Sequence, residues 1–170
     1  MGNPGRRDDG LGPAFVSALE KTKLKGLALE ADYQLQVEDA VLFSEYDKVI
    51  VVDASKKGKE PFGWRKLRPA RKCSFTTHAL PPEAVLDLCL TLYGKKPQAF
   101  LLAIRGYDFE IGEGLSPAAG RNLRAALRFF ENKFYSATPD DGASAIIKIP
   151  AKLKREKHRH GKKQKRSPGA

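Results

Sequence analysis

Two uninterrupted apolar runs constrain the fold of this chain more than any other feature of its sequence. The runs are Val49–Val52 and Ala99–Ile104, and every residue in them is apolar. A strand with one face in water alternates apolar and polar residues, whereas a strand covered on both faces reads as a continuous apolar run. The two runs therefore predict central strands of a parallel sheet with helices on both sides.

Helical patterns separate these expected strands. They cover about residues 13–25, 81–93 and 117–134, and each begins at or next to a proline, which suits the first turn of a helix. Gly26 and Gly94 follow the first two patterns, where glycine commonly ends a helix. Alternating strands and helices predict an α/β fold, namely a three-layer α/β/α sandwich around a mostly parallel, twisted sheet.

Four weaker segments complete the expected order of elements. Residues 27–33 alternate well enough for a strand, and residues 37–44 for a short helical or irregular piece. Residues 56–71 are polar, basic and bounded by prolines, which is typical of a surface excursion such as an edge hairpin. Three isoleucines, at positions 146, 147 and 149, indicate a last extended piece whose place in the sheet stays open.

The first twelve residues form a glycine-rich segment with two adjacent acids. Met1–Gly12 contains four glycines, one proline and the pair Asp8-Asp9. Glycine permits positive φ and close approach of other atoms, so a tight backbone is expected. A turn of this kind at the start of a helix usually follows a buried strand. Since none precedes it here, we expect the first strand of the sheet to be missing from the N-terminus.

The net charge of +11 is concentrated at the end of the chain. Residues 151–170 hold nine Lys or Arg against Glu156, which gives +8 and leaves +3 for residues 1–150. We therefore expect one α/β domain over residues 1–150 and a basic, disordered tail over residues 151–170. The tail could bind an acidic partner or nucleic acid, but the domain lacks the basic face with interleaved aromatic residues that nucleic-acid binding favours.

Membrane insertion and a disulfide framework are both disfavoured. No apolar run reaches the length of a membrane span, and the N-terminus carries no apolar segment of a secretion signal. Cys73 and Cys89 are sixteen residues apart without a Cys-x-x-Cys pattern. This spacing favours reduced, structural thiols in a cytoplasmic protein over a disulfide or a metal site.

Three ionisable residues are expected at the carboxyl edge of the sheet, where parallel sheets bind ligands. Asp9 lies in the glycine-rich segment, Asp53 follows the run Val49–Val52, and His78 precedes the helix that begins near Pro81. Two carboxylates and an imidazole form a partial metal shell with open positions, and they suit nickel or zinc better than calcium or magnesium. Each residue also has an ordinary alternative: a helix cap, a turn residue and a hydrogen-bonded surface histidine, respectively.

The glycine-rich segment resembles the opening signature of the hydrogenase maturation proteases. The matching residues are Gly2-Asn3-Pro4 and Arg7-Asp8-Asp9-Gly10-Leu11-Gly12, and the resemblance continues in Val49–Ala54, Ser74–Leu80 and Gly112–Ser116. Members of this family are endopeptidases that trim the C-terminus of the precursor of a nickel–iron hydrogenase large subunit after nickel insertion. The resemblance implies a peptide-bond hydrolase of the cytoplasm with such a precursor as its partner.

By this resemblance, Asp9, Asp53 and His78 match the residues with which these proteases engage nickel, and they are the implied catalytic set. The nickel belongs to the substrate, so no permanent cofactor is expected. Cleavage through a metal-polarised carbonyl and cleavage through a metal-activated water both stay open. The chain departs from the family in two places: the short apolar strand before the signature is absent, and the segment Ala31–Asp39 lacks the glycine found in many members.

Two other functions fit parts of the sequence. Peptidyl-tRNA hydrolases also open with Gly-Asn-Pro-Gly and would use a basic surface, but they continue into an Arg-His-Asn segment with an essential histidine. This chain has Arg6-Arg7-Asp8-Asp9 there and no histidine before His78. The second alternative is a non-catalytic chaperone or adaptor that binds the hydrogenase precursor. Alanine substitution of the three candidate residues would distinguish an adaptor from a protease.

Overall fold

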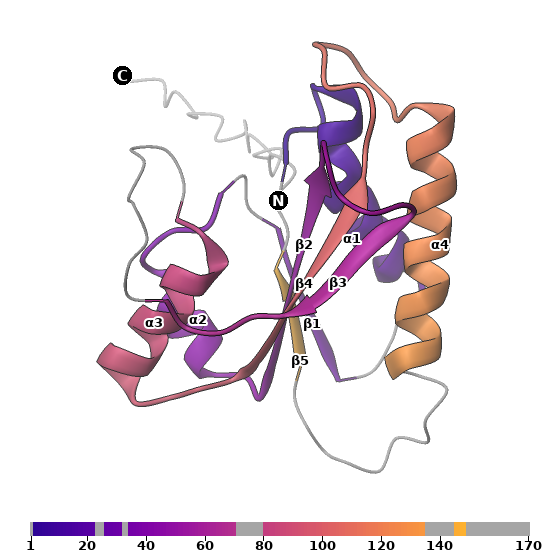
Figure 1. The fold of residues 1–170 in the computed structure, drawn as a ribbon. Coiled ribbons are helices and arrows are strands. Elements are labelled where there is room, and N and C mark those ends of the chain that lie inside the picture. The colour runs from indigo at the N-terminus through magenta and orange to yellow at the C-terminus, as the bar shows by residue number, and fades with distance from the viewer. Residues whose placement is uncertain (1, 23–25, 32–33, 71–79, 135–144, 149–170) are drawn as a thin grey trace, which may run out of the picture.

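A five-stranded sheet forms the centre of the computed structural model, which describes residues 2–22, 26–31, 34–70, 80–134 and 145–148 (Figure 1). The order of its strands is β1-β5-β2-β4-β3. The strands are β1 (Leu27–Glu30), β2 (Lys48–Ser55), β3 (Phe62–Lys66), β4 (Gln98–Arg105) and β5 (Ala145–Lys148). All neighbours are parallel except β3, which is antiparallel to β4 at one edge. The predicted mostly parallel α/β sheet is confirmed.

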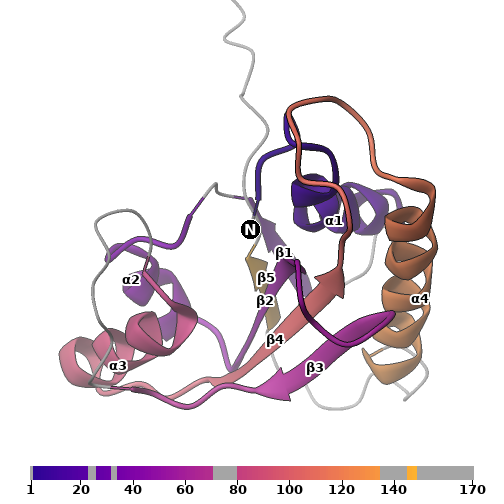
Figure 2. The same cartoon turned by 45° about the horizontal axis from the view of Figure 1, so that its top comes forward.

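Helices cover both faces of this sheet, which confirms the predicted three layers (Figure 2). One face carries α1 (Leu11–Thr22) and α4 (Pro117–Phe134), and the other carries α2 (Asp39–Ser44) and α3 (Pro82–Tyr93). A short 3-10 turn, η1 (Arg7–Gly10), leads into α1. Ser116 caps α4, because its hydroxyl accepts a hydrogen bond from the Ala119 amide at 3.2 Å.

Strand β2 is buried on both faces, as its continuous apolar run predicts. Ile50 and Val52 pack in the core under α1 and α4, whereas Val49 and Val51 pack in the core under α2 and α3. All four side chains are fully buried, and burial of each contributes about 1.5–3 kcal/mol. These contacts fix the carboxyl end of β2, which carries Asp53.

Strand β5 occupies the middle of the sheet, between β1 and β2. Ile147 pairs with Leu29 on one side and Ile50 on the other, and its side chain is fully buried. The predicted extended piece is thus confirmed for Ile146 and Ile147, while position 149 lies outside the described residues. No described residue before η1 forms a strand, and yet β1 and β2 are both paired, because the C-terminal part of the chain supplies the strand between them.

Two details of the prediction are corrected. Asp53 lies within β2, which extends to Ser55, and does not follow the strand. Residues 62–66 form an edge strand paired with β4 and no hairpin with β2. In α3, Val85, Leu86 and Cys89 are buried, whereas Leu92 is 58% exposed.

Cys89 is a buried free thiol in α3, and burial raises its pKa, in keeping with the predicted structural role. Cys73 lies outside the described residues. None of the described helices is long and apolar enough to cross a membrane.

Candidate functional site

Two loops and the end of β2 meet at the carboxyl edge of the sheet. The N-terminal loop (residues 2–10) lies beside the β4–α4 loop (residues 106–116), and backbone hydrogen bonds join them. The Arg7 amide donates to the Gly112 carbonyl at 3.0 Å, and the Gly112 amide donates to the Gly5 carbonyl at 2.9 Å. The Arg6 guanidinium adds bonds to the Phe109 carbonyl at 3.1 and 3.2 Å. The edge of the sheet is therefore built from segments about a hundred residues apart in sequence.

The N-terminal loop is as tight as its glycine content predicts. Gly2 has φ 138°, and a Cβ atom there would come within 1.8 Å of the Asp9 carbonyl oxygen. Only glycine therefore allows the start of the chain to fold back against the backbone of Asp9. This close approach also lets the backbone amide of Asn3 donate a 2.8 Å hydrogen bond to Oδ2 of Asp9.

Asp8 is the anchor of this edge. Its side chain is fully buried, and four donors surround its carboxylate. The amides of Tyr107 and Asp108 donate to Oδ2 at 2.8 and 2.9 Å, the Ser116 amide donates to Oδ1 at 2.7 Å, and the Ser116 hydroxyl donates to Oδ2 at 2.8 Å. Burial by itself would raise the pKa of Asp8, but these hydrogen bonds outweigh it and hold the pKa below its usual value.

Asp9, the next residue, has a different environment. It is only partly buried, and its bond from Asn3 closes the N-terminal loop. That donor precedes Asp9 in the chain, so this bond does not cap α1, which was the ordinary structural alternative for this residue. A carboxylate with one such bond keeps lone pairs for a further donor or a cation.

Asp53 lies close enough to Asp9 for the two carboxylates to influence each other. Its Oδ1 accepts a 2.9 Å hydrogen bond from the Ala54 amide. Burial is the largest influence on the pKa of Asp53 and raises it. The positive charge of the N-terminus and the bond from Ala54 lower this pKa, and the negative charge of Asp9 raises it by a smaller amount. Asp9 and Asp53, two of the three predicted site residues, therefore interact electrostatically. A nearby cation would relieve their repulsion.

His78, the third predicted residue, lies outside the described residues. Within the described part of the chain, no group of three or more His, Cys, Asp or Glu residues could hold a metal ion. The two acids therefore form an incomplete shell by themselves.

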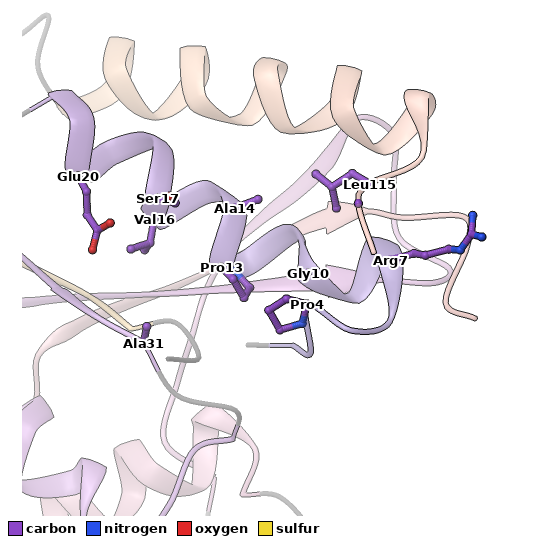
Figure 3. Close-up of a pocket in the computed structure, with 11 residues that line it drawn as sticks. Pro4, Arg7, Gly10, Pro13, Ala14, Val16, Ser17, Glu20, Ala31 and Leu115 are labelled. Atoms are coloured by element: carbon purple, nitrogen blue, oxygen red, sulfur yellow. The ribbon is translucent and has the colours of Figure 1, made fainter. Parts of the chain in front are cut away.

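A groove of about 340 Å³ adjoins the N-terminal loop (Figure 3). We call it the α1 groove, since one wall is formed by that helix. Its other walls come from the N-terminal loop, from Ala31 after β1 and from the end of the β4–α4 loop. The lining is mostly apolar and includes Pro4, Pro13, Val16 and Leu115. One charged residue lies at either end, Arg7 at one and Glu20 at the other.

Sequence reasoning missed two of these features. It named Asp8 only as the neighbour of Asp9, although the buried residue of the pair carries the loop contacts. The available signal was the pair of acids in a glycine-rich turn, which does not tell which one faces inward. The α1 groove had no signal in the sequence, because its walls come from three separate segments: the N-terminal loop with α1, Ala31, and the end of the β4–α4 loop.

The fold resembles solved structures of proteins named as hydrogenase maturation proteases. The endopeptidase HybD from E. coli has a TM-score of 0.59 and 20% identity, over 81% of this chain and 90% of that protein. The hydrogenase 2 maturation peptidase from a Thaumarchaeota archaeon has a TM-score of 0.58 and 20% identity, over 79% of this chain and 93% of that protein. The protease HycI from Thermococcus kodakarensis KOD1 has a TM-score of 0.59 and 19% identity, over 76% of this chain and 85% of that protein.

At this level of identity the likeness shows a shared fold. No protein-family model matches the sequence. No curated protein matches it either.

Proposed function

We propose that this protein is an endopeptidase that removes a C-terminal extension from the precursor of a nickel–iron hydrogenase large subunit. The observation that carries the proposal is the pair Asp9 and Asp53 at the carboxyl edge of a sheet whose fold is shared with solved maturation proteases. The N-terminal signature, Gly2-Asn3-Pro4 with Asp8-Asp9, supports the same function over the peptidyl-tRNA hydrolase alternative.

The proposed substrate signal is the nickel ion that the precursor already holds. Asp9 and Asp53 repel each other, so a cation presented between them is bound more favourably than a neutral group. His78 would complete the set, as the sequence resemblance implies. In this proposal the ion stays with the substrate, as the sequence resemblance implies, and docks the scissile peptide against the two acids.

This arrangement makes cleavage conditional on nickel insertion. Without the ion, Asp9 and Asp53 present two negative charges to the precursor, and these charges repel each other. With it, the ion both positions the peptide and supplies Lewis acidity, either to a peptide carbonyl or to an attacking water. The residues of this chain would orient the ion, and Asp8 would keep Asp9 in place by fixing the N-terminal loop against the β4–α4 loop.

The test is the intact mass of a nickel-loaded precursor after incubation with this protein. We expect loss of a C-terminal peptide, no loss from nickel-free precursor, and no loss with Asp9→Ala, Asp53→Asn or His78→Ala. An untouched nickel-loaded precursor that still binds the unsubstituted chain would contradict the protease and favour the adaptor alternative. Cleavage that persists in all three variants would contradict the proposed role of these residues.

A further inference from the structure

A second cavity lies at the amino end of the parallel strands, away from the candidate acids. Its volume of about 640 Å³ is within the usual range for ligand pockets, about 300–1,000 Å³. We call it the α3 pocket, because one wall is formed by that helix. Its other walls come from the end of β3 with the residues that follow it, and from the start of β4 with the residues that precede it.

The α3 pocket is separate from the proposed active site. Gln98, which lines it, begins β4, whereas Asp53 is paired with Ala103, five residues further along that strand. At about 3.3 Å per residue, about 16 Å of strand lie between Gln98 and Ala103. Figure 2 shows that β4 starts on the side of α3 and ends on the side of α1. A ligand confined to this pocket therefore does not contact the two acids.

The floor of the α3 pocket is apolar and continues beyond the cavity on the surface of α3. Leu67 and Leu86 line the pocket and are buried in one core cluster. Leu90 and Tyr93 follow Leu86 at the spacing of a single helix face, and they are 38% and 43% exposed. Exposed apolar side chains with a polar rim mark sites of protein interaction.

The rim of the α3 pocket is basic. Its cations are Lys66, Arg68 and Lys96, and none of them forms an ion pair with another described residue. Among the described residues that line the pocket, Asp87 is the one acid. Three positive charges against one negative charge give +2, so the uncompensated charge of the pocket is positive.

Contacts between β3, β4 and α3 form the α3 pocket in advance of any ligand. The Leu67 amide donates a 2.8 Å hydrogen bond to the Ala99 carbonyl, and the Ala70 amide donates one of 3.1 Å to the Glu83 carbonyl. An ion pair between Arg65 and Glu83, with 2.7 Å between Nη2 and Oε1, also joins β3 to α3. Because the walls are fixed by the fold, little conformational freedom is lost when a ligand binds.

We propose that the α3 pocket is a docking site for an acidic, amphipathic peptide segment of a partner protein. Aliphatic side chains of the segment lie in the pocket against Leu90, and its carboxylates pair with the basic rim. Charge complementarity selects this occupant, because the charge of the rim is positive. The chain's own tail does not fit, since its net charge of +8 has the same sign as that of the rim.

The shape of the site favours a peptide over a compact anion. A small anion would need only the three cations, and it would leave the apolar floor in water. A peptide with both acidic and aliphatic side chains covers the floor and the rim together, and it also reaches Leu90 and Tyr93 beyond the cavity. An apolar centre with a charged rim is the usual composition of such interfaces.

Two double variants of the full-length chain test the charge of the rim. Arg68→Glu with Lys96→Glu reverses two of its cations. Arg121→Glu with Arg128→Glu is the matched control, because both arginines are exposed on α4 and do not line the pocket, and the change in net charge is the same. The probe is a fluorescein-labelled synthetic peptide of Glu-Glu-Leu-Leu repeats, whose binding is followed by anisotropy. The control accounts for attraction of any acidic peptide to the basic tail.

Two single variants test the apolar floor with the same probe. Leu90→Gln places a polar group in the lining of the pocket. Leu92→Gln is its control, because Leu92 is 58% exposed on the same helix but does not line the pocket. All four substituted positions of the rim and the floor are exposed, so the fold should be kept, and an unchanged midpoint of urea unfolding checks this for each variant.

We expect Arg68→Glu with Lys96→Glu to weaken binding of the peptide at least tenfold, and its control pair to stay within threefold of the unsubstituted chain. Leu90→Gln should weaken binding about fivefold or more, with Leu92→Gln within twofold. A peptide of Glu-Glu-Ser-Ser repeats should bind at least tenfold more weakly than the probe. Equal weakening by both double variants would show that the peptide responds to overall charge alone, and it would overturn the proposal.

Two other occupants would give different results. If a second copy of this chain covers the pocket, the unsubstituted chain sediments as a dimer and Leu90→Gln sediments as a monomer. If nucleic acid fills it, a labelled oligouridine binds, and Arg68→Glu with Lys96→Glu weakens that binding at least as much as binding of the peptide. Either result would overturn the proposal.

Discussion

Asp8 and Asp9 are neighbours in sequence, but their carboxylates have different local environments, one inside the molecule and one at its surface. Asp8 is fully buried among four donors, and its pKa is lowered by them. Asp9 is partly exposed, has a bond from the Asn3 amide and lies near a second acid, Asp53. The first environment consumes the lone pairs of a carboxylate in holding two loops together, whereas the second leaves lone pairs for a cation.

This difference shows how one short loop serves both stability and chemistry. The bonds to Asp8 fix the N-terminal loop against the β4–α4 loop, and therefore they also fix the position of Asp9. The acid that would act on the substrate then needs few contacts of its own. Substitutions of the two residues should consequently separate stability from activity.

The largest expected effect is the loss of stability in Asp8→Ala. This change leaves the amides of Tyr107, Asp108 and Ser116 without their acceptor in a buried place. Each hydrogen bond to a charged group contributes about 1.5–3 kcal/mol, and non-additivity reduces the total, so we expect a loss of about 3–5 kcal/mol. Urea denaturation measures it. A loss below about 1 kcal/mol would show that Asp8 does not fix the two loops, and Asp8 and Asp9 would then not differ in their contribution to stability.

A smaller loss is expected for Ser116→Ala, which removes one of the four donors and the cap of α4 together. The Ser116 hydroxyl both donates to Asp8 at 2.8 Å and accepts from the Ala119 amide at 3.2 Å. Loss of a helix N-cap costs about 1–2 kcal/mol. The measured quantity is again the free energy of unfolding, and the double variant with Asp8→Ala should be less destabilised than the sum of the two. Simple additivity would argue against a shared network.

Much of this fold could be predicted from local sequence. The apolar runs identified β2 and β4, because strands buried on both faces leave a continuous pattern within a few residues. Pro81 and Gly94 marked the two ends of α3, and Pro117 marked the start of α4, because these residue types favour helix boundaries. Asp9 and Asp53 could be predicted to converge, since both segments end at the carboxyl edge of one parallel sheet.

Two features depend on contacts that local sequence does not encode. Ile147 has the same pattern in an edge strand and in an interior one, so its position between β1 and β2 follows only from pairing over about a hundred residues. Likewise, the donors to Asp8 lie in the β4–α4 loop. A tight turn has no fixed period, and so nothing in residues 2–10 alone indicates which acid faces inward.

Asp9→Ala should give the reverse of Asp8→Ala, with a large effect on activity and a small one on stability. We expect cleavage of nickel-loaded precursor to fall at least a hundredfold, because the acid that faces the substrate is gone. The free energy of unfolding should change by less than about 1 kcal/mol, since only one hydrogen bond is lost, from the Asn3 backbone amide, and this bond is exposed to water, unlike the bonds to Asp8. A variant that unfolds as readily as Asp8→Ala, measured in the same urea series, would show that both acids are structural.

The smallest effect on stability, and one of opposite sign, is expected for Asp53→Asn. Burial and the charge of Asp9 raise the pKa of Asp53, so the folded protein binds a proton there more readily than the unfolded chain does. The favourable contribution of this group is therefore fully present at low pH and is lost as the pH rises through the raised pKa. At neutral pH the buried charge destabilises the fold, and its removal should raise Tm while abolishing cleavage.

The pH dependence separates this explanation from a simple packing effect. Below the ordinary aspartate pKa of 3.8, position 53 is uncharged in both proteins, so the gain in Tm from Asp53→Asn should vanish there. Thermal unfolding of the variant and the unsubstituted chain, at neutral pH and at about pH 3, measures the difference. A gain that is equal at both pH values would come from packing. A lower Tm of the variant at neutral pH would show that the fold favours the charged carboxylate of Asp53. The repulsion between Asp9 and Asp53 that favours binding of a cation would then be absent.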